Sequence, residues 1–164
     1  MPMKKRIRRE DEMIDYDTNI QTHEQFVELL LKLRKLTKYI TIVQPYRKNK
    51  GEPLIRKAMN SMELIDEYRS HEWYGTYTLG YGYVYEFDVK YKGFFKDLMR
   101  YEAFYIPLED KYGCYRPQKT DFGFDDIAFL DEDKQPLFYT TTHEGYSMIH
   151  PDVLEVGALC FSTV

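Results

Sequence analysis

The clearest pattern along the chain is a helical one that begins at Thr22. Thr22 and Gln25 fit a capping box, in which each side chain bonds the backbone N–H of the other residue. Hydrophobic residues then recur every three or four positions, the spacing of one face of an α-helix: Phe26, Leu29, Leu30, Leu33, Leu36 and Ile40. This segment therefore predicts an amphipathic helix.

A short strand and a second helix are expected next. The β-branched segment Tyr39–Gln44 predicts a strand, which Pro45 ends. Pro53 suits the first position of a helix. Because its apolar spacing continues, we expect this helix to end only before Ser70, with these residues on its buried face: Ile55, Ala58, Met59, Met62 and Ile65.

In the middle of the chain, hydrophobic residues recur at every second position instead. Aromatic and apolar residues alternate with polar ones, which predicts a half-buried strand whose aromatic face points inward: Tyr83, Tyr85, Phe87, Val89 and Tyr91. We expect Trp73–Leu79 to be its antiparallel neighbour, with a turn at residues 80–82.

The last third of the chain predicts a hairpin. Strands are expected at Ile127–Leu130 and Leu137–Thr142, joined by the acidic turn of residues 131–136. A short helix over Phe94–Phe104 and a short strand at Ser147–Ile149 complete the pattern. Residues from Pro151 onward fit a helix or a strand equally.

These elements predict an α+β fold with a mostly antiparallel sheet and two helices packed on one face. Strand–helix alternation is missing from the second half, which argues against a doubly wound parallel sheet. A length of 164 residues favours a single domain. We expect a flexible, charged N-terminal arm at residues 1–21 and one domain at residues 22–164.

Composition narrows the class of protein. Hydrophobic residues make up 43% and charged residues 30%, which is typical of a globular domain. No stretch approaches the roughly 20 apolar residues of a membrane helix, and the basic start lacks a signal-peptide core. The two cysteines, Cys114 and Cys160, form no C-x-x-C pair, and whether they join is open. A cytoplasmic location is expected.

The net charge is -4, but the charged residues are unevenly distributed along the chain. Basic residues dominate between Lys32 and Lys57, and acidic residues dominate between Glu102 and Asp133. A basic first half interleaved with Tyr39 and Tyr46 fits a nucleic-acid-associated factor. Because the net charge is negative and no nucleic-acid-binding motif is present, nucleic acid is the less favoured partner.

No complete catalytic motif is present. The candidates are His71, His143 and Glu144, which suit a hydrolase that uses histidine and carboxylate, with or without a metal. Cys114 is a candidate nucleophile because it follows a glycine in an expected loop. Metal-binding, phosphate-cradling and G-x-S-x-G motifs are all missing, so we predict no cofactor and no metal.

The surplus of tyrosine is the main hint of function. Sixteen tyrosines are more than a core of this size would hide, and aromatic side chains anchor protein interfaces. We predict a binding surface in which aromatic anchors lie beside acidic residues: Trp73, Tyr74, Asp125, Asp126 and Asp131.

Three motifs resemble a group of small, uncharacterised cytoplasmic proteins of spore-forming bacteria, some labelled "stage III sporulation protein AH". The motifs are His-Glu-Trp-x-Gly-Thr at residues 71–76, Asp-Ile-x-Phe-Leu-Asp at residues 126–131, and Leu-Phe-Tyr-Thr-x-Thr-His-Glu at residues 137–144. Together with the strand of Tyr83 and Tyr85, the resemblance covers about residues 70–146. It implies no catalytic residues.

The layout is also similar to that of small immunity proteins, which bind a toxin through a charged, aromatic surface. The sequence therefore predicts a non-enzymatic protein that binds another protein and does not act at a membrane. The hydrolase and the nucleic-acid factor are the alternatives, and the oligomeric state is left open.

Overall fold

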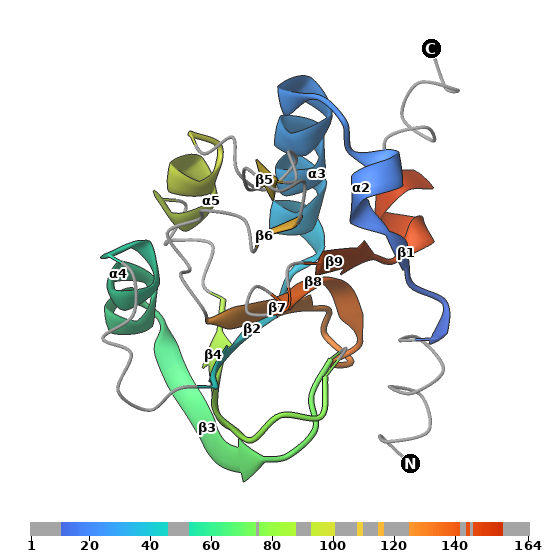
Figure 1. The fold of residues 1–164 in the computed structure, drawn as a ribbon. Coiled ribbons are helices and arrows are strands. Elements are labelled where there is room, and N and C mark those ends of the chain that lie inside the picture. The colour runs from blue at the N-terminus through green and yellow to red at the C-terminus, as the bar shows by residue number, and fades with distance from the viewer. Residues whose placement is uncertain are drawn as a thin grey trace.

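Helices cover one face of a mostly antiparallel sheet in the computed structural model, which confirms the predicted α+β class (Figure 1). The structure describes residues 11–45, 53–74, 76–87, 93–100, 108–109, 115–116, 125–141, 144 and 146–155. The main sheet has the strand order β1-β9-β8-β7-β2-β4-β3, and each neighbouring pair is antiparallel. Its strands are β1 (Ile14–Asp15), β2 (Tyr39–Gln44), β3 (Glu63–Ser70), β4 (Gly80–Glu86), β7 (Asp126–Leu130), β8 (Pro136–Thr141) and β9 (Tyr146–Ile149). A separate pair consists of β5 (Leu108–Glu109) and β6 (Tyr115–Arg116).

The first predicted helix is confirmed as α3 (His23–Leu36). The hydroxyl of its N-cap, Thr22, accepts the backbone N–H of Gln25 at 3.1 Å, and Gln25 Oε1 accepts the backbone N–H of Thr22 at 3.1 Å. This reciprocal pair satisfies donors that the first helical turn would otherwise leave unbonded. The predicted stripe supplies its buried residues, Phe26, Leu29, Leu30 and Leu33, but its last member, Ile40, lies in β2.

The core lies between the sheet and three helices, α3, α4 (Pro53–Ser61) and α5 (Gly93–Leu98). Aromatic rings fill its centre: the ring centroids of Phe129 on β7 and Phe138 on β8 lie 5.7 Å apart, and the ring of Phe95 on α5 is 5.6 Å from Phe129. Tyr85 is also buried here, so the predicted inward face of its strand is confirmed at this position. This packing positions the helices above β2, β7 and β8.

The predicted hairpin is confirmed as β7 and β8. Ile127 pairs with Thr140 and Phe129 with Phe138, so the strands run antiparallel. The turn contains Lys134 with a φ of 57°, a left-handed backbone conformation that side chains rarely adopt. The predicted strand before Pro151 is confirmed as β9, and residues 151–155 are helical.

Two predictions about the middle of the chain are wrong. The second helix ends at Ser61, and β3 follows at once, although we expected helix almost to Ser70. β4 pairs with β2 and β3 rather than with Trp73–Leu79, and residues 80–82 lie inside β4. The apolar spacing of α4 continues by coincidence into Ile65, so periodicity could not mark the change of element.

Part of the expected N-terminal arm belongs to the fold. β1 pairs with β9, and α2 (Tyr16–Asn19) follows directly. Tyr16 and Ile20 are buried in the core, and Tyr16 lies against Phe138 with ring centroids 5.6 Å apart. Within residues 11–21, apolar side chains therefore anchor a segment whose charge suggested an arm.

Candidate binding surface

The face of the sheet opposite the helices is covered in part by the segment between β3 and β4 (Figure 1). Trp73 lies in this segment, is 6% exposed, and donates its indole N–H to Asp126 Oδ2 on β7 at 2.8 Å. Its ring packs against Gly80, where an added Cβ would lie 2.7 Å from Trp73 Cη2. The contact fastens the segment to the sheet.

The neighbouring aromatic residue is held in the same way. Tyr74 is 4% exposed and stacks on Tyr139 of β8, with ring centroids 5.5 Å apart. Its carbonyl oxygen accepts the hydroxyl of Thr141 at 3.0 Å. Tyr74 therefore belongs to a second apolar cluster on this face.

The predicted binding surface is not exposed in this structure. Trp73, Tyr74, Asp125 and Asp126 are all buried, and Asp125 accepts the Gln44 side-chain amide at 3.4 Å. Their chemistry stabilises the fold, because a buried carboxylate needs hydrogen-bond donors around it. In this structure their contacts are with other residues of the fold.

A small cavity lies beneath Trp73 and Tyr74. The rest of its lining comes from three strands: Thr41 and Val43 of β2, Asp126, Ile127 and Ala128 of β7, and Tyr139 and Thr140 of β8. Its volume is about 10 Å³, which is room for roughly one water molecule. A cavity of this size admits no substrate.

Asp131 has a structural role in the turn between β7 and β8. Its Oδ1 accepts the backbone N–H groups of Asp133 and Gln135, both at 2.9 Å. These bonds fix the tight turn that contains Lys134. Oδ1 of Asp131, which we expected to contact a partner, therefore accepts hydrogen bonds from the turn itself.

The candidate catalytic residues are only partly described. His71 and Glu144 are exposed, and Glu144 Oε1 accepts the Thr76 hydroxyl at 2.7 Å. His143, Cys114 and Cys160 lie outside the described residues. No group of three or more His, Cys, Asp or Glu residues in the described ranges could hold a metal ion.

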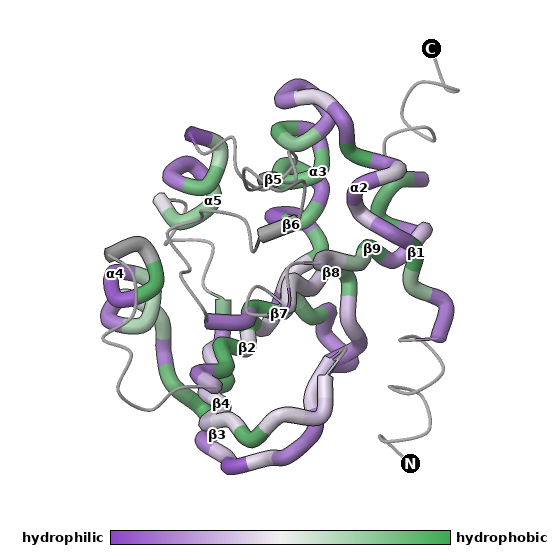
Figure 2. The backbone as a smooth tube through the Cα atoms, in the orientation of Figure 1, coloured by the Kyte–Doolittle hydropathy of each residue, from purple (hydrophilic) through white to green (hydrophobic). Residues whose placement is uncertain are grey.

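Among the strand residues whose burial the structure describes, the most exposed apolar ones lie in β3, which the sequence did not predict. We define the acidic edge as the exposed segment Glu63–Glu67 of this strand. It combines three carboxylates with Leu64 and Ile65, which are 44% and 39% exposed. Figure 2 shows both hydrophobic and hydrophilic colours along β3. Apolar side chains with polar residues around them match the arrangement of protein interfaces, which have a hydrophobic centre and a polar rim.

The acidic edge also influences the core beneath it. Burial, followed by the charges of Tyr83 and Glu67, raises the pKa of Tyr85 to about 12. Because this folded-state pKa exceeds the unfolded value of about 10, Tyr85 stabilises the fold below pH 10. That contribution is lost as the pH rises toward 12.

Replacing Tyr85 with Phe should therefore make stability fall less steeply above pH 10. Urea unfolding followed by circular dichroism across this pH range measures the effect. Tyr77→Phe is the control, because Tyr77 is 84% exposed. A steep alkaline loss in Tyr85→Phe equal to that of the unaltered protein would contradict the assignment.

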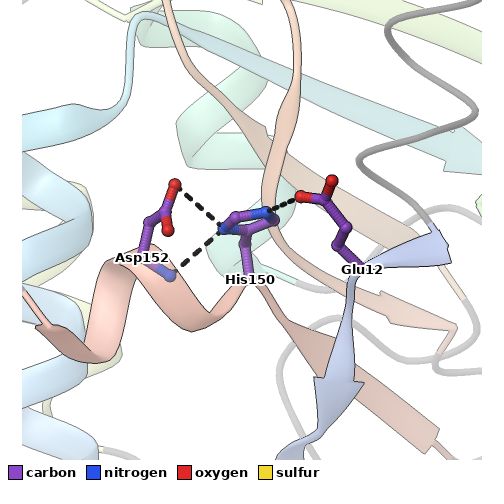
Figure 3. A network of polar contacts seen from close by, with 3 residues as sticks. All are labelled: Glu12, His150 and Asp152. Carbon is purple, nitrogen blue, oxygen red and sulfur yellow. Dashed lines mark hydrogen bonds and ion pairs between the residues drawn. The ribbon is translucent and has the colours of Figure 1, made fainter.

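A second site that the sequence analysis missed surrounds His150 (Figure 3). This side chain is 4% exposed; its Nε2 lies 2.9 Å from Glu12 Oε2, and its Nδ1 accepts the backbone N–H of Asp152 at 3.2 Å. In the neutral imidazole, a ring whose Nδ1 accepts this N–H donates from Nε2 to Glu12. His150 thereby caps the helix of residues 151–155 and fastens the chain near β1 to it. In the sequence, Pro151 was the signal that could have indicated the start of this helix, because proline favours the first helical position.

Comparisons with known proteins leave the family open. No protein-family model, curated protein or solved structure matches this chain. None of the helices in the described ranges has the length and apolar character needed to cross a membrane. The candidate function therefore depends on the surface of the molecule itself.

Proposed function

We propose that this protein is a non-enzymatic module that binds another protein through the acidic edge. The observation that carries the proposal is the exposure of Leu64 and Ile65 on a strand at the border of the sheet. Natural proteins usually protect such strands from contact with other chains.

The charge of this surface indicates the chemistry of the partner. Glu63, Asp66 and Glu67 are exposed acids within five consecutive residues of β3. Acidic groups around apolar anchors accelerate association with a basic protein and disfavour acidic ones. An immunity-like role, in which the partner is a basic toxin, is the form of this proposal closest to the resemblance in layout.

The test is capture of the partner by the tagged, full-length chain from nuclease-treated extract of its native host. Asp66→Lys with Glu67→Lys reverses two charges of the acidic edge and should weaken capture about tenfold, most strongly at low salt. The matched control is Glu132→Lys with Asp133→Lys, which reverses two exposed acids in the turn between β7 and β8.

One protein captured in stoichiometric amount by the unaltered chain and the control, but not by the edge variant, would support the proposal. Equal capture by the unaltered chain and the edge variant would refute it. Loss in the control alone would assign binding to the β7–β8 turn instead.

A further inference from the structure

We propose that the partner adds an extended, basic strand to the open side of β3. This inference rests on the proposed function and specifies how the acidic edge is recognised. In this mode, backbone hydrogen bonds provide affinity, and alternate side chains provide specificity.

β3 has the position and length that strand addition requires. It is the last strand of the seven-stranded sheet and contains eight residues, more than the usual five or six. Among the described residues, β4 is its one neighbouring strand, and Figure 1 shows β3 at the outer border of the sheet. The opposite border is β1, which has two residues and offers far less backbone for pairing.

One backbone contact shows which groups of β3 face outward. The N–H of Glu67 donates to Oδ1 of Asp66 at 2.9 Å, so a side chain of β3 itself occupies this donor. In an antiparallel ladder, backbone groups of alternate residues point to opposite sides of the strand. The regular pairing of residues 67–69 with β4 therefore places the N–H of Arg69 on the same outer side as that of Glu67.

Asp66 thus holds a position that an incoming carbonyl oxygen would take. A partner strand would accept the N–H of Glu67 and leave the carboxylate of Asp66 to bind a basic side chain. Leu64 and Ile65 lie at the start of the same segment and would pack against apolar side chains of the strand. The ligand is accordingly an extended segment that combines Lys or Arg with β-branched residues.

A second copy of this chain is a poorer occupant. If two β3 strands paired antiparallel about their centres, Asp66 and Glu67 would face the same acids of the other copy. Like charges opposite each other destabilise a strand pair. Charge complementarity therefore favours a basic segment of a different protein.

The test uses an eight-residue peptide of alternating Lys and Val, matched to β3 in length. A peptide with Glu in place of Lys is the control. Arg69→Pro removes an outward N–H and leaves the side of β3 that faces β4 intact. Arg69→Ala is the matched variant, because it loses the same charge and the same contact with the Tyr81 ring but keeps the N–H.

We expect Arg69→Ala to bind the Lys peptide about as well as the unaltered protein, and Arg69→Pro to bind roughly tenfold or more weakly. Fluorescence anisotropy measures the affinities, and sedimentation checks for self-association. Equal binding by the Pro and Ala variants would overturn strand addition. Dimers that dissociate in Arg69→Pro would assign the edge to a second copy instead.

Hydrogen exchange of the unaltered protein provides a second measurement that does not depend on how the Pro variant folds. The Lys peptide should slow exchange of the Glu67 and Arg69 amides, and the Glu peptide should not. Unchanged exchange at both amides would overturn the proposal. Another outcome is that the Lys peptide fails to bind while the variant with Asp66→Lys and Glu67→Lys still fails to capture the partner. That result would refute strand addition and leave the proposed function supported.

Discussion

Replacing Trp73 with Phe is expected to lower the free energy of unfolding by roughly 2–4 kcal/mol. The variant loses the hydrogen bond from the indole to the buried carboxylate of Asp126 and leaves space beside Gly80. Because Trp73 is the single tryptophan of the chain, unfolding must be followed by circular dichroism rather than by indole fluorescence. A loss below about 0.5 kcal/mol, the range of a surface substitution, would show that Trp73 does not fasten this segment to the sheet.

Gly80→Ala provides a sharper test of the same packing. A Cβ at this position would lie 2.7 Å from both Trp73 Cη2 and Val43 Cγ1, so the buried indole must move. The ring of Phe is smaller and does not extend to the position of Cη2. Gly80→Ala should therefore cost less in the Trp73→Phe background than in the unaltered protein, and additive losses would contradict the contact.

The sequence predicted those parts of the fold that depend on local signals. The capping box of Thr22 and Gln25 marked the start of α3, and the regular apolar spacing defined its buried face. The hairpin of β7 and β8 was predictable because two strongly hydrophobic segments flank a short polar turn. In each case, neighbouring residues alone decide the structure.

The site was less predictable, because it depends on contacts between distant residues. Trp73 and Asp126 are 53 positions apart, and an acidic segment ordinarily indicates a solvated turn, so their mutual burial had no local signal. The strand β3 was missed because its local pattern indicated the wrong kind of element. An exposed strand shows no alternation of buried and exposed residues, and Ile65 continued the apolar spacing of the preceding helix.

Replacing His150 with Ala is expected to destabilise the protein by roughly 2–3 kcal/mol. The buried imidazole caps the helix of residues 151–155 through the backbone N–H of Asp152, and it also binds Glu12. Both contacts disappear in the variant, and the amide of Asp152 loses its acceptor. Urea unfolding provides the free energy, and Asp11→Asn, at an exposed residue beside Glu12, is the control.

His150→Asn separates the two contacts, because Asn is a strong N-cap residue but is too short to replace the imidazole at Glu12. It should recover about 1 kcal/mol of the loss, the usual value of a cap, and leave the remainder to the bond with Glu12 and to packing. Glu12→Gln should cost less than either His150 variant, since the Gln side chain still offers an oxygen to Nε2. If His150→Asn were as unstable as His150→Ala, the cap would contribute nothing. The stability of this region would then depend on how His150 joins the chain near β1 to the helix after β9, a contact between segments 138 residues apart.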